Sequence, residues 1–251
     1  GSPETWGIAP DQFHSWCSDM AATWPDTMTC GTTHDTKRSE DVRSRIGVLS
    51  QYAPEWRAMI TKLQPLMEGI EGHTANLLWQ TIAGTWTEDG PIEVERLQRY
   101  ALKAAREQKI WTSWTNQDSE KEKVLTDRLA RLLAEPDVVT GFTEWFKLVS
   151  PSVRTSILSR KAIQLTCLGV ADNYQGCETL QNWLVDPDNR VRADFPALAT
   201  TLSYLDRREP LTLAEEKLHL TRAIFRLRRR LPEVFVGRDA LYRPLPRSTG
   251  P

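Results

Sequence analysis

The chain has 251 residues, enough for one large domain or two small ones with a substantial buried core. Its 32 Lys and Arg residues balance 33 Asp and Glu residues, and the net charge of −1 argues against a protein built mainly to bind nucleic acid or an anionic membrane. Apolar residues make up 40% of the chain, as in a globular domain, and no apolar run is long enough to span a bilayer. We therefore expect a folded protein without a nucleic-acid or membrane partner.

The chain is rich in tryptophan. Its ten Trp residues exceed what a core of this size normally needs. Indole rings are good platforms for sugar rings and for cations, whereas packing between helices is the alternative use for any one of them. Sugar binding is therefore one reading of this composition.

The four Cys residues and the start of the chain indicate the cellular setting. The cysteines lie too far apart for a zinc site, so we predict no metal and expect reduced thiols in a cytoplasmic protein: Cys17, Cys30, Cys167 and Cys177. The start, from Gly1 to Glu4, has neither Met nor the features of a signal peptide. We expect the chain to be a processed piece, a tagged protein or an internal fragment of a longer one.

The hydrophobic pattern predicts a mainly helical fold with few strands. Apolar residues recur every three or four positions in several segments, which is the spacing of one helix face. The predicted helices lie around residues 40–49, 56–67, 77–84, 94–104, 119–132, 158–165 and 212–227. Capping boxes of the type Ser/Thr-x-x-Glu are expected to begin two of them, at Ser119 and Thr212. The basic run 226–230 ends the last helix, where we expect a solvated face.

Two segments have strand character. Residues 27–34 are rich in Thr and end at Asp35, and residues 169–175 follow a predicted helix. A strand, a long helical excursion and a second strand predict that the two strands are parallel. Residues 241–245 are a weaker candidate for a further strand.

Three polar clusters are candidates for chemistry. Residues 32–41 follow the first strand and contain His34 next to Asp35, a pair that can bind sugar hydroxyls, transfer protons or hold a metal. Residues 174–190 follow the second strand. Residues 103–114 lead from a helix into two Trp residues that flank Thr-Ser, and the pair of Lys103 and Glu107 is spaced for a surface ion pair. Solvated loops and helix faces are the alternative for all three clusters.

Together these clusters resemble the maltooligosyl trehalose synthase family, a branch of the α-amylase family of (β/α)8 barrels. The similarity runs from about Trp6 to Leu245 in the family's order. The most specific strings are His-Asp-Thr-Lys-Arg-Ser-Glu-Asp at 34–41 and Leu-Val-Asp-Pro-Asp-Asn-Arg at 184–190. Three shorter segments, 102–107, 112–114 and 174–178, agree with them.

The resemblance implies a fragment of a (β/α)8 barrel, strands 7 and 8 with their helices, that carries a helical insertion. Residues 1–55 would hold strand 7 and the following helix, and residues 56–150 the insertion. Residues 151–235 would hold strand 8 and the closing helices. Residues 236–251 would begin a truncated C-terminal β domain.

The resemblance also implies an activity. The family converts the reducing-end α-1,4 linkage of a maltooligosaccharide into an α,α-1,1 linkage, an intramolecular glucosyl transfer with retaining-glycosidase chemistry and no cofactor. The substrate would be a maltooligosaccharide or another glycogen-derived glucan. Another α-amylase-family transglucosidase or hydrolase is an alternative, and so is a non-catalytic, helical glucan-binding domain.

Individual residues receive roles from the same resemblance. Asp35 matches the third carboxylate of the α-amylase triad, which stabilises the oxocarbenium-like transition state, and His34 matches the hydroxyl-binding histidine beside it. The remaining substrate contacts implied are Lys37, Arg38, Lys103, Arg106, Thr112, Trp114, Tyr174, Glu178, Asp186, Asn189 and Arg190. The family's nucleophilic Asp and acid/base Glu lie on strands 4 and 5, before Gly1, so we expect the isolated chain to be inactive and to pair with the missing N-terminal part.

Overall fold

The computed structural model describes residue 4 and residues 7–184 and 191–245. The chain divides into two compact units. We call them the strand unit, made of residues 1–31, 158–179 and 194–251, and the helical unit, made of residues 32–157 and 180–193. Each unit therefore combines segments that are distant in the sequence.

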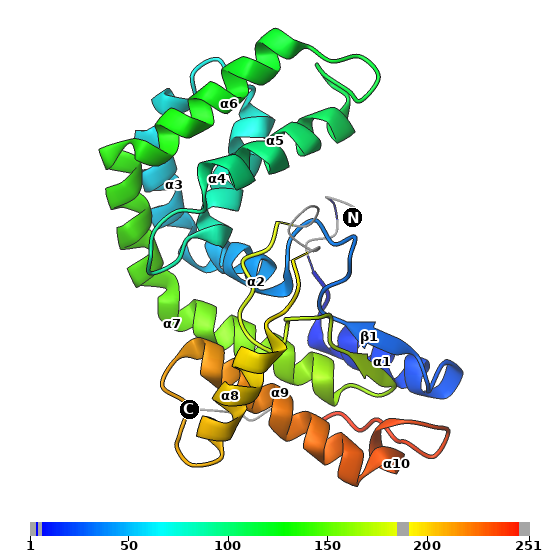
Figure 1. The fold of residues 1–251 in the computed structure, drawn as a ribbon. Coiled ribbons are helices and arrows are strands. Elements are labelled where there is room, and N and C mark those ends of the chain that lie inside the picture. Colours follow the sequence, from blue (N-terminus) through cyan, green and yellow to red (C-terminus); the bar gives the residue numbers. More distant parts are fainter. Residues whose placement is uncertain (1–3, 5–6, 185–190, 246–251) are drawn as a thin grey trace. The chain divides into compact units, whose positions relative to one another are not determined.

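Helices dominate both units (Figure 1). The helical unit contains α2 (Glu40–Val48), α3 (Ala53–Leu63), α4 (Gly72–Thr85), α5 (Val94–Gln108), α6 (Ser119–Ala134), the larger part of α7 (Pro136–Thr166) and the short 3-10 helices η1 (Leu49–Tyr52) and η2 (Gln64–Met67). The strand unit contains α1 (Pro10–Thr23), β1 (Met28–Cys30), the end of α7, β2 (Val170–Asp172), α8 (Phe195–Leu205), α9 (Leu213–Arg230) and α10 (Pro232–Phe235). The mainly helical prediction with few strands is confirmed.

Side-chain caps fix where several helices begin. Thr212 caps α9 as predicted, because its hydroxyl accepts a hydrogen bond from the backbone N–H of Glu215 at 3.2 Å. The predicted cap at Ser119 is wrong by one residue. Asp118 caps α6 instead, and its carboxylate accepts from the N–H of Lys121 at 3.1 Å. A charged acceptor at this position also interacts favourably with the positive end of the helix dipole.

The longest helix, α7, passes through a proline. The sequence predicts a helix after Pro151, but α7 begins at Pro136 and continues through Pro151 to Thr166. Side chains on both sides of the proline are buried, among them Trp145 and Val153. Their packing offsets the backbone hydrogen bond that proline cannot make.

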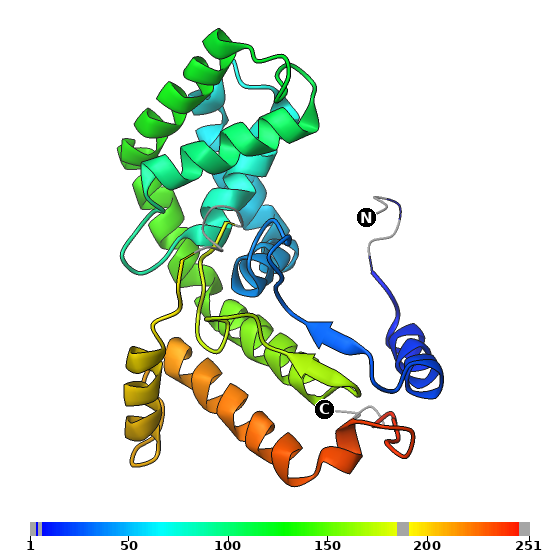
Figure 2. The same ribbon diagram turned by 45° about the vertical axis from the view of Figure 1, so that its right-hand side comes forward.

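The two strands pair in parallel, as predicted (Figure 2). Met28 lies opposite Val170, and Cys30 lies opposite Asp172, so each strand is three residues long and shorter than expected. The predicted strand at residues 241–245 is wrong, because that segment has no regular structure. Gly169 precedes β2 with a positive φ of 92°, which lets its backbone approach the carbonyl of Thr27.

Aromatic rings fill the core of the helical unit. Phe142 of α7 stacks on Trp79 and Trp86, with ring centroids 5.8 and 5.3 Å apart. Trp56 packs edge-on against Phe142 and Trp145 at 6.2 and 5.2 Å. These four Trp residues are therefore packing residues and not candidates for sugar binding.

One residue of the basic run is buried. Arg228 of α9 is 9% exposed and donates hydrogen bonds to the carbonyls of Leu165 and Cys167, at 2.9 and 3.0 Å, and of Gly169. The last carbonyls of a helix lack partners inside it, so the end of α7 attracts a cation. Burial lowers the pKa of Arg228. The prediction of a solvated basic face is therefore wrong at this position.

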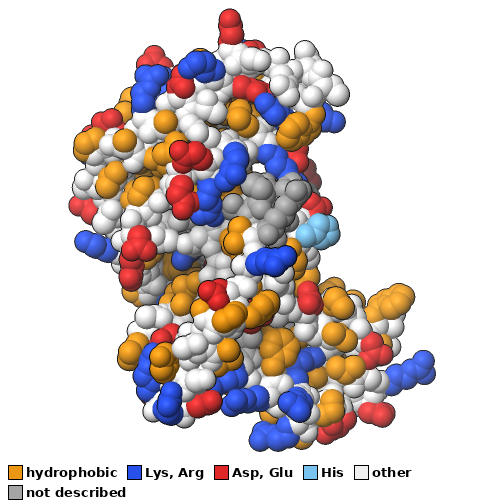
Figure 3. Space-filling view, viewed as in Figure 1, with side chains coloured by type: hydrophobic (Ala, Val, Ile, Leu, Met, Phe, Trp, Pro, Cys, Tyr) orange, Lys and Arg blue, Asp and Glu red, His pale blue; other side chains and the backbone are white. Residues whose placement is uncertain are grey.

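None of the described helices combines the length and apolar character that crossing a membrane requires. On the helical unit, in the upper part of Figure 3, acidic and basic side chains are interspersed.

Candidate functional site

The segment between β1 and α2 carries the most specific string of the sequence, and hydrogen bonds fix it to the start of α2. Thr32 is fully buried, and its hydroxyl oxygen accepts from the backbone N–H of Glu40 at 3.0 Å. Ser39 caps α2, because its hydroxyl oxygen accepts from the N–H of Val42 at 3.4 Å. The first turn of α2 thus anchors both ends of the segment.

His34 and Asp35 lie at the tip of a turn within this segment. The hydroxyl of Thr33 accepts from the backbone N–H groups of Asp35 and Thr36, each at 3.2 Å. In return, the N–H of Thr33 donates to the hydroxyl of Thr36 at 3.2 Å. The turn is therefore closed by side chains, and it presents His34 and Asp35 at the surface, with the Asp35 side chain 79% exposed.

A chain of ion pairs connects this turn to α5. The Lys37 ammonium lies 3.8 Å from the Asp35 carboxylate and 3.2 Å from that of Glu107. Glu107 also pairs with Lys103 at 3.7 Å, which confirms the predicted pair on this helix. The structure thus gathers Lys37 and Lys103 around one glutamate, and Lys37 connects Asp35 to this group.

Arg38 is turned toward the protein. Its guanidinium donates to the hydroxyl of Thr81 at 2.8 Å and to the carbonyl of Leu77 at 3.4 Å, both on α4, and lies 5.8 Å from the ring centroid of Tyr100 on α5. Arg38 also forms an isolated antiparallel bridge with Leu184. Its contacts link the turn to two helices.

The start of the second specific string packs on α2. The N–H of Ser39 donates to the carbonyl of Trp183 at 3.0 Å, and the N–H of Gln181 donates to the carboxylate of Asp41 at 2.7 Å. The structure therefore brings the two strings together at Leu184. The candidate residues Asp186, Asn189 and Arg190 lie outside the described residues.

A buried arginine supports this contact. Arg45 of α2 donates to the carbonyl of Gly84 at 3.2 Å and to the side-chain oxygen of Asn182. Burial lowers its pKa, and the charge of Asp41 acts in the opposite direction. The sequence analysis missed Arg45 and Asn182. The sequence indicates Arg45 only through its spacing from Asp41, one helical turn apart, and gives no indication of Asn182.

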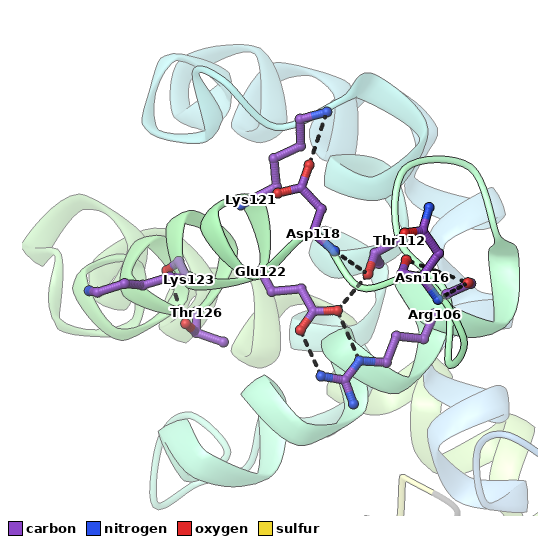
Figure 4. A network of polar contacts seen from close by, with 9 residues as sticks. Arg106, Thr112, Asn116, Asp118, Lys121, Glu122, Lys123 and Thr126 are labelled. Carbon is purple, nitrogen blue, oxygen red and sulfur yellow. Dashed lines mark hydrogen bonds and ion pairs between the residues drawn. The ribbon is translucent and has the colours of Figure 1, made fainter.

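The third cluster is organised by Glu122 of α6 (Figure 4). Its carboxylate accepts from Arg106 Nε at 2.9 Å, from Arg106 Nη2 at 2.6 Å and from the Thr112 hydroxyl at 2.6 Å. The Arg106 guanidinium also lies 5.0 Å from the ring centroid of Trp114, which is 54% exposed. Three predicted site residues thus meet through a glutamate that the sequence offered only as part of a capping box.

The contacts of Glu122 lower its pKa. The hydrogen bonds from Arg106 lower the pKa of Glu122, burial opposes this shift and Thr112 adds to it. A carboxyl with a lowered pKa stabilises the folded state above its unfolded pKa, about 4.3 for Glu, and this stabilisation disappears as the pH falls through the folded pKa.

We therefore expect the stability difference between the wild-type chain and Glu122→Gln to be largest at neutral pH and to shrink below about pH 4. Thermal unfolding at a series of pH values measures it. Asp127→Asn is the control, because Asp127 pairs with Lys123 at an exposed position on the same helix. A difference that is constant from neutral to acidic pH would contradict the assignment.

The remaining described candidates, Tyr174 and Glu178, follow β2 in the strand unit. The carbonyl of Tyr174 accepts from the N–H of Cys177 at 2.9 Å, which closes a turn. Oxygen Oε2 of Glu178 is buried and has no hydrogen-bond partner among the described residues. Among all residues that the structure describes, no three His, Cys, Asp or Glu side chains gather as a metal site would require.

Comparisons with known proteins identify relatives over most of the chain. No family model matches it. It is 35% identical over 240 residues to a Mycobacterium tuberculosis protein assigned as a maltooligosyl trehalose synthase. It is 38% identical to the maltooligosyltrehalose synthase structure from Arthrobacter ramosus, with a TM-score of 0.86, and 30% identical to a structure from Sulfolobus tokodaii described as a hypothetical maltooligosyl trehalose synthase, with a TM-score of 0.83.

Each match covers 94% of this chain but only 30% to 33% of the relative. The chain therefore spans about a third of the length of these proteins. Its sequence and its fold both relate it to the maltooligosyl trehalose synthases, of which it corresponds to one part.

Proposed function

We propose that this chain supplies part of the active site of an enzyme that makes maltooligosyl trehalose. The reaction moves the reducing-end glucose of a maltooligosaccharide from an α-1,4 to an α,α-1,1 linkage. The observation that carries the proposal is the Asp35 carboxylate, exposed on a turn closed by Thr33 and Thr36 within the string 34–41, one of the two strings on which the resemblance mainly rests. A carboxylate held this way can face a substrate without reorganising.

In this proposal Asp35 stabilises positive charge at the transition state. Cleavage of the glycosidic bond passes through an oxocarbenium-like state, and a fixed carboxylate lowers its energy more than that of the neutral ground state. His34 beside it binds sugar hydroxyls. Lys37 lies 3.8 Å from Asp35, where its ammonium can orient the carboxylate.

The other predicted site residues bind the glucan. Lys103, Arg106, Thr112 and Trp114 belong to the helical insertion of the proposed barrel, and Tyr174 and Glu178 follow the strand assigned as the eighth. Oε2 of Glu178 is buried without a hydrogen-bond partner among the described residues, which supports a ligand-binding role, because buried oxygens normally have a partner. Arg38 supports the site from within, through α4 and α5.

The nucleophile and the acid/base residue would lie in the part of the relatives that this chain does not span. The four segments 1–55, 56–150, 151–235 and 236–251 would then be strand 7 with its helix, the insertion, strand 8 with the closing helices, and the start of a β domain. The isolated chain would be inactive. Its partners would be that other part and a glycogen-derived glucan in the cytoplasm.

A chimera tests the proposal. Residues 7–245 replace the matching region of the Arthrobacter ramosus protein, and the product from maltopentaose is analysed by NMR. We expect a non-reducing product with an α,α-1,1 linkage. New reducing ends without that linkage, from a chimera that unfolds cooperatively, would show a hydrolase and reject the proposal.

A further inference from the structure

Glu122 of α6 organises the third cluster, yet the proposed function gives it no role. Its side chain is only 9% exposed, and it connects α6 to α5 and to the loop 109–118. Both carboxylate oxygens accept hydrogen bonds from within the protein: Oε1 from Arg106 and Thr112, and Oε2 from Arg106. A buried carboxylate engaged in this way acts on its neighbours rather than on a ligand.

The first neighbour is Arg106, which Glu122 holds by two of its three guanidinium nitrogens. The third, Nη1, makes no hydrogen bond with any residue that the structure describes. Such a side-on pair fixes the plane of the guanidinium. A lysine in place of Arg106 would have no planar group for Glu122 to orient. Glu122 therefore leaves one donor group of Arg106 available in a fixed direction.

The second neighbour is the loop that carries Trp114. Thr112 donates to Glu122 at 2.6 Å and accepts from the N–H of Asp118 at 3.3 Å, so the loop is tied down on both sides of Trp114. Arg106 covers one face of the indole at 5.0 Å, yet Trp114 is 54% exposed. About half of this side chain is therefore still accessible to a ligand.

We propose that Glu122 is a positioning residue that holds Trp114 and Arg106 Nη1 together as a glucosyl-binding platform. The C–H face of a pyranose ring packs on the exposed part of the indole, and a sugar hydroxyl accepts from Nη1. The inference rests on the proposed function, from which it takes the glucan, and adds the residue that builds this surface.

Binding of maltopentaose to the chain itself tests the platform. The indole N–H resonance of Trp114, assigned with Trp114→Phe, is followed by NMR as maltopentaose is added. We expect a saturable shift, and a weakening of the affinity by about tenfold in Glu122→Gln, which corresponds to the loss of one well-placed hydrogen bond to a charged group. Asp127→Asn on the same helix should leave the affinity unchanged.

Arg106→Lys is the second variant, because it keeps the charge next to Glu122 but removes the planar fork and the donor at Nη1. It should weaken binding as Glu122→Gln does, while thermal unfolding shows that the chain is still folded. No saturable shift at Trp114, or equal affinities in the wild-type chain and both variants, would overturn the inference.

The two proposals fail in different experiments. A chimera that makes the α,α-1,1 product while Trp114 does not respond to maltopentaose overturns the platform only. A Trp114 response that depends on Glu122, in a chain whose chimera only hydrolyses, supports the platform and rejects the proposed synthesis.

Discussion

Replacing Asp35 by Asn in the chimera should lower the rate of trehalosyl product formation by a factor of about 100 to 1000, the usual effect of removing one electrostatic stabiliser of a transition state. Asparagine keeps the size of the side chain and the backbone hydrogen bond to Thr33, so the turn should remain. What disappears is the negative charge opposite the developing oxocarbenium ion. Initial rates with maltopentaose at saturating concentration measure the effect.

Asp89→Asn is a matched control for this variant. Asp89 is also exposed, and its N–H donates to the hydroxyl of Thr87 at 3.2 Å, the same local geometry as that of Asp35 and Thr33. Its replacement should leave the rate within about a factor of two, as surface substitutions do. Equal rates for Asp35→Asn and Asp89→Asn would refute the role assigned to Asp35.

Gly169→Ala should be the most destabilising substitution in the strand unit, with a cost of about 3 kcal/mol or more from backbone strain and steric overlap together. A Cβ atom at this position would lie 2.1 Å from the carbonyl oxygen of Thr27. That oxygen accepts from the N–H of Val170 at 2.8 Å and so starts the pairing of β1 and β2. The strands cannot move apart without breaking this bond.

The control for this variant is Gly237→Ala. Gly237 has nearly the same φ, 95° against 92°, but no atom lies within 4 Å of the Cβ position. It should cost only the conformational strain, about 1–2 kcal/mol. Thermal unfolding followed by circular dichroism compares the two variants, and equal losses would show that the close approach to Thr27 is not essential.

Most helices of the helical unit could be predicted, because one face of each is buried and its apolar residues therefore recur every three or four positions. Two helices of the strand unit, α1 and α8, were not singled out. Each leaves large apolar side chains exposed, Trp16 at 50% on α1 and Phe195 at 55% on α8, so neither has a clean apolar face. Both strands are predicted at the right places but too long. The first ends at Cys30, because the hydroxyl of Thr32 already accepts a hydrogen bond from the start of α2.

Contacts within the candidate site were predictable where its residues are neighbours in the sequence. The turn with His34 and Asp35 and the pair of Lys103 and Glu107 are of this kind. The bond from Arg45 to Asn182 joins residues 137 positions apart, and no local spacing indicates it. Glu122 is predictable only in part. Its sequence pattern correctly marks the start of a helix, but its side chain accepts hydrogen bonds from Arg106, which the pattern does not indicate.

We propose that this chain forms only part of a composite glucan-rearranging site. The most direct test incubates maltopentaose with the isolated chain and with the chimera at equal concentration, and follows both by product NMR. The account predicts an α,α-1,1-linked product from the chimera and unchanged maltopentaose with the chain alone. Turnover of maltopentaose to a trehalosyl product by the isolated chain would contradict it.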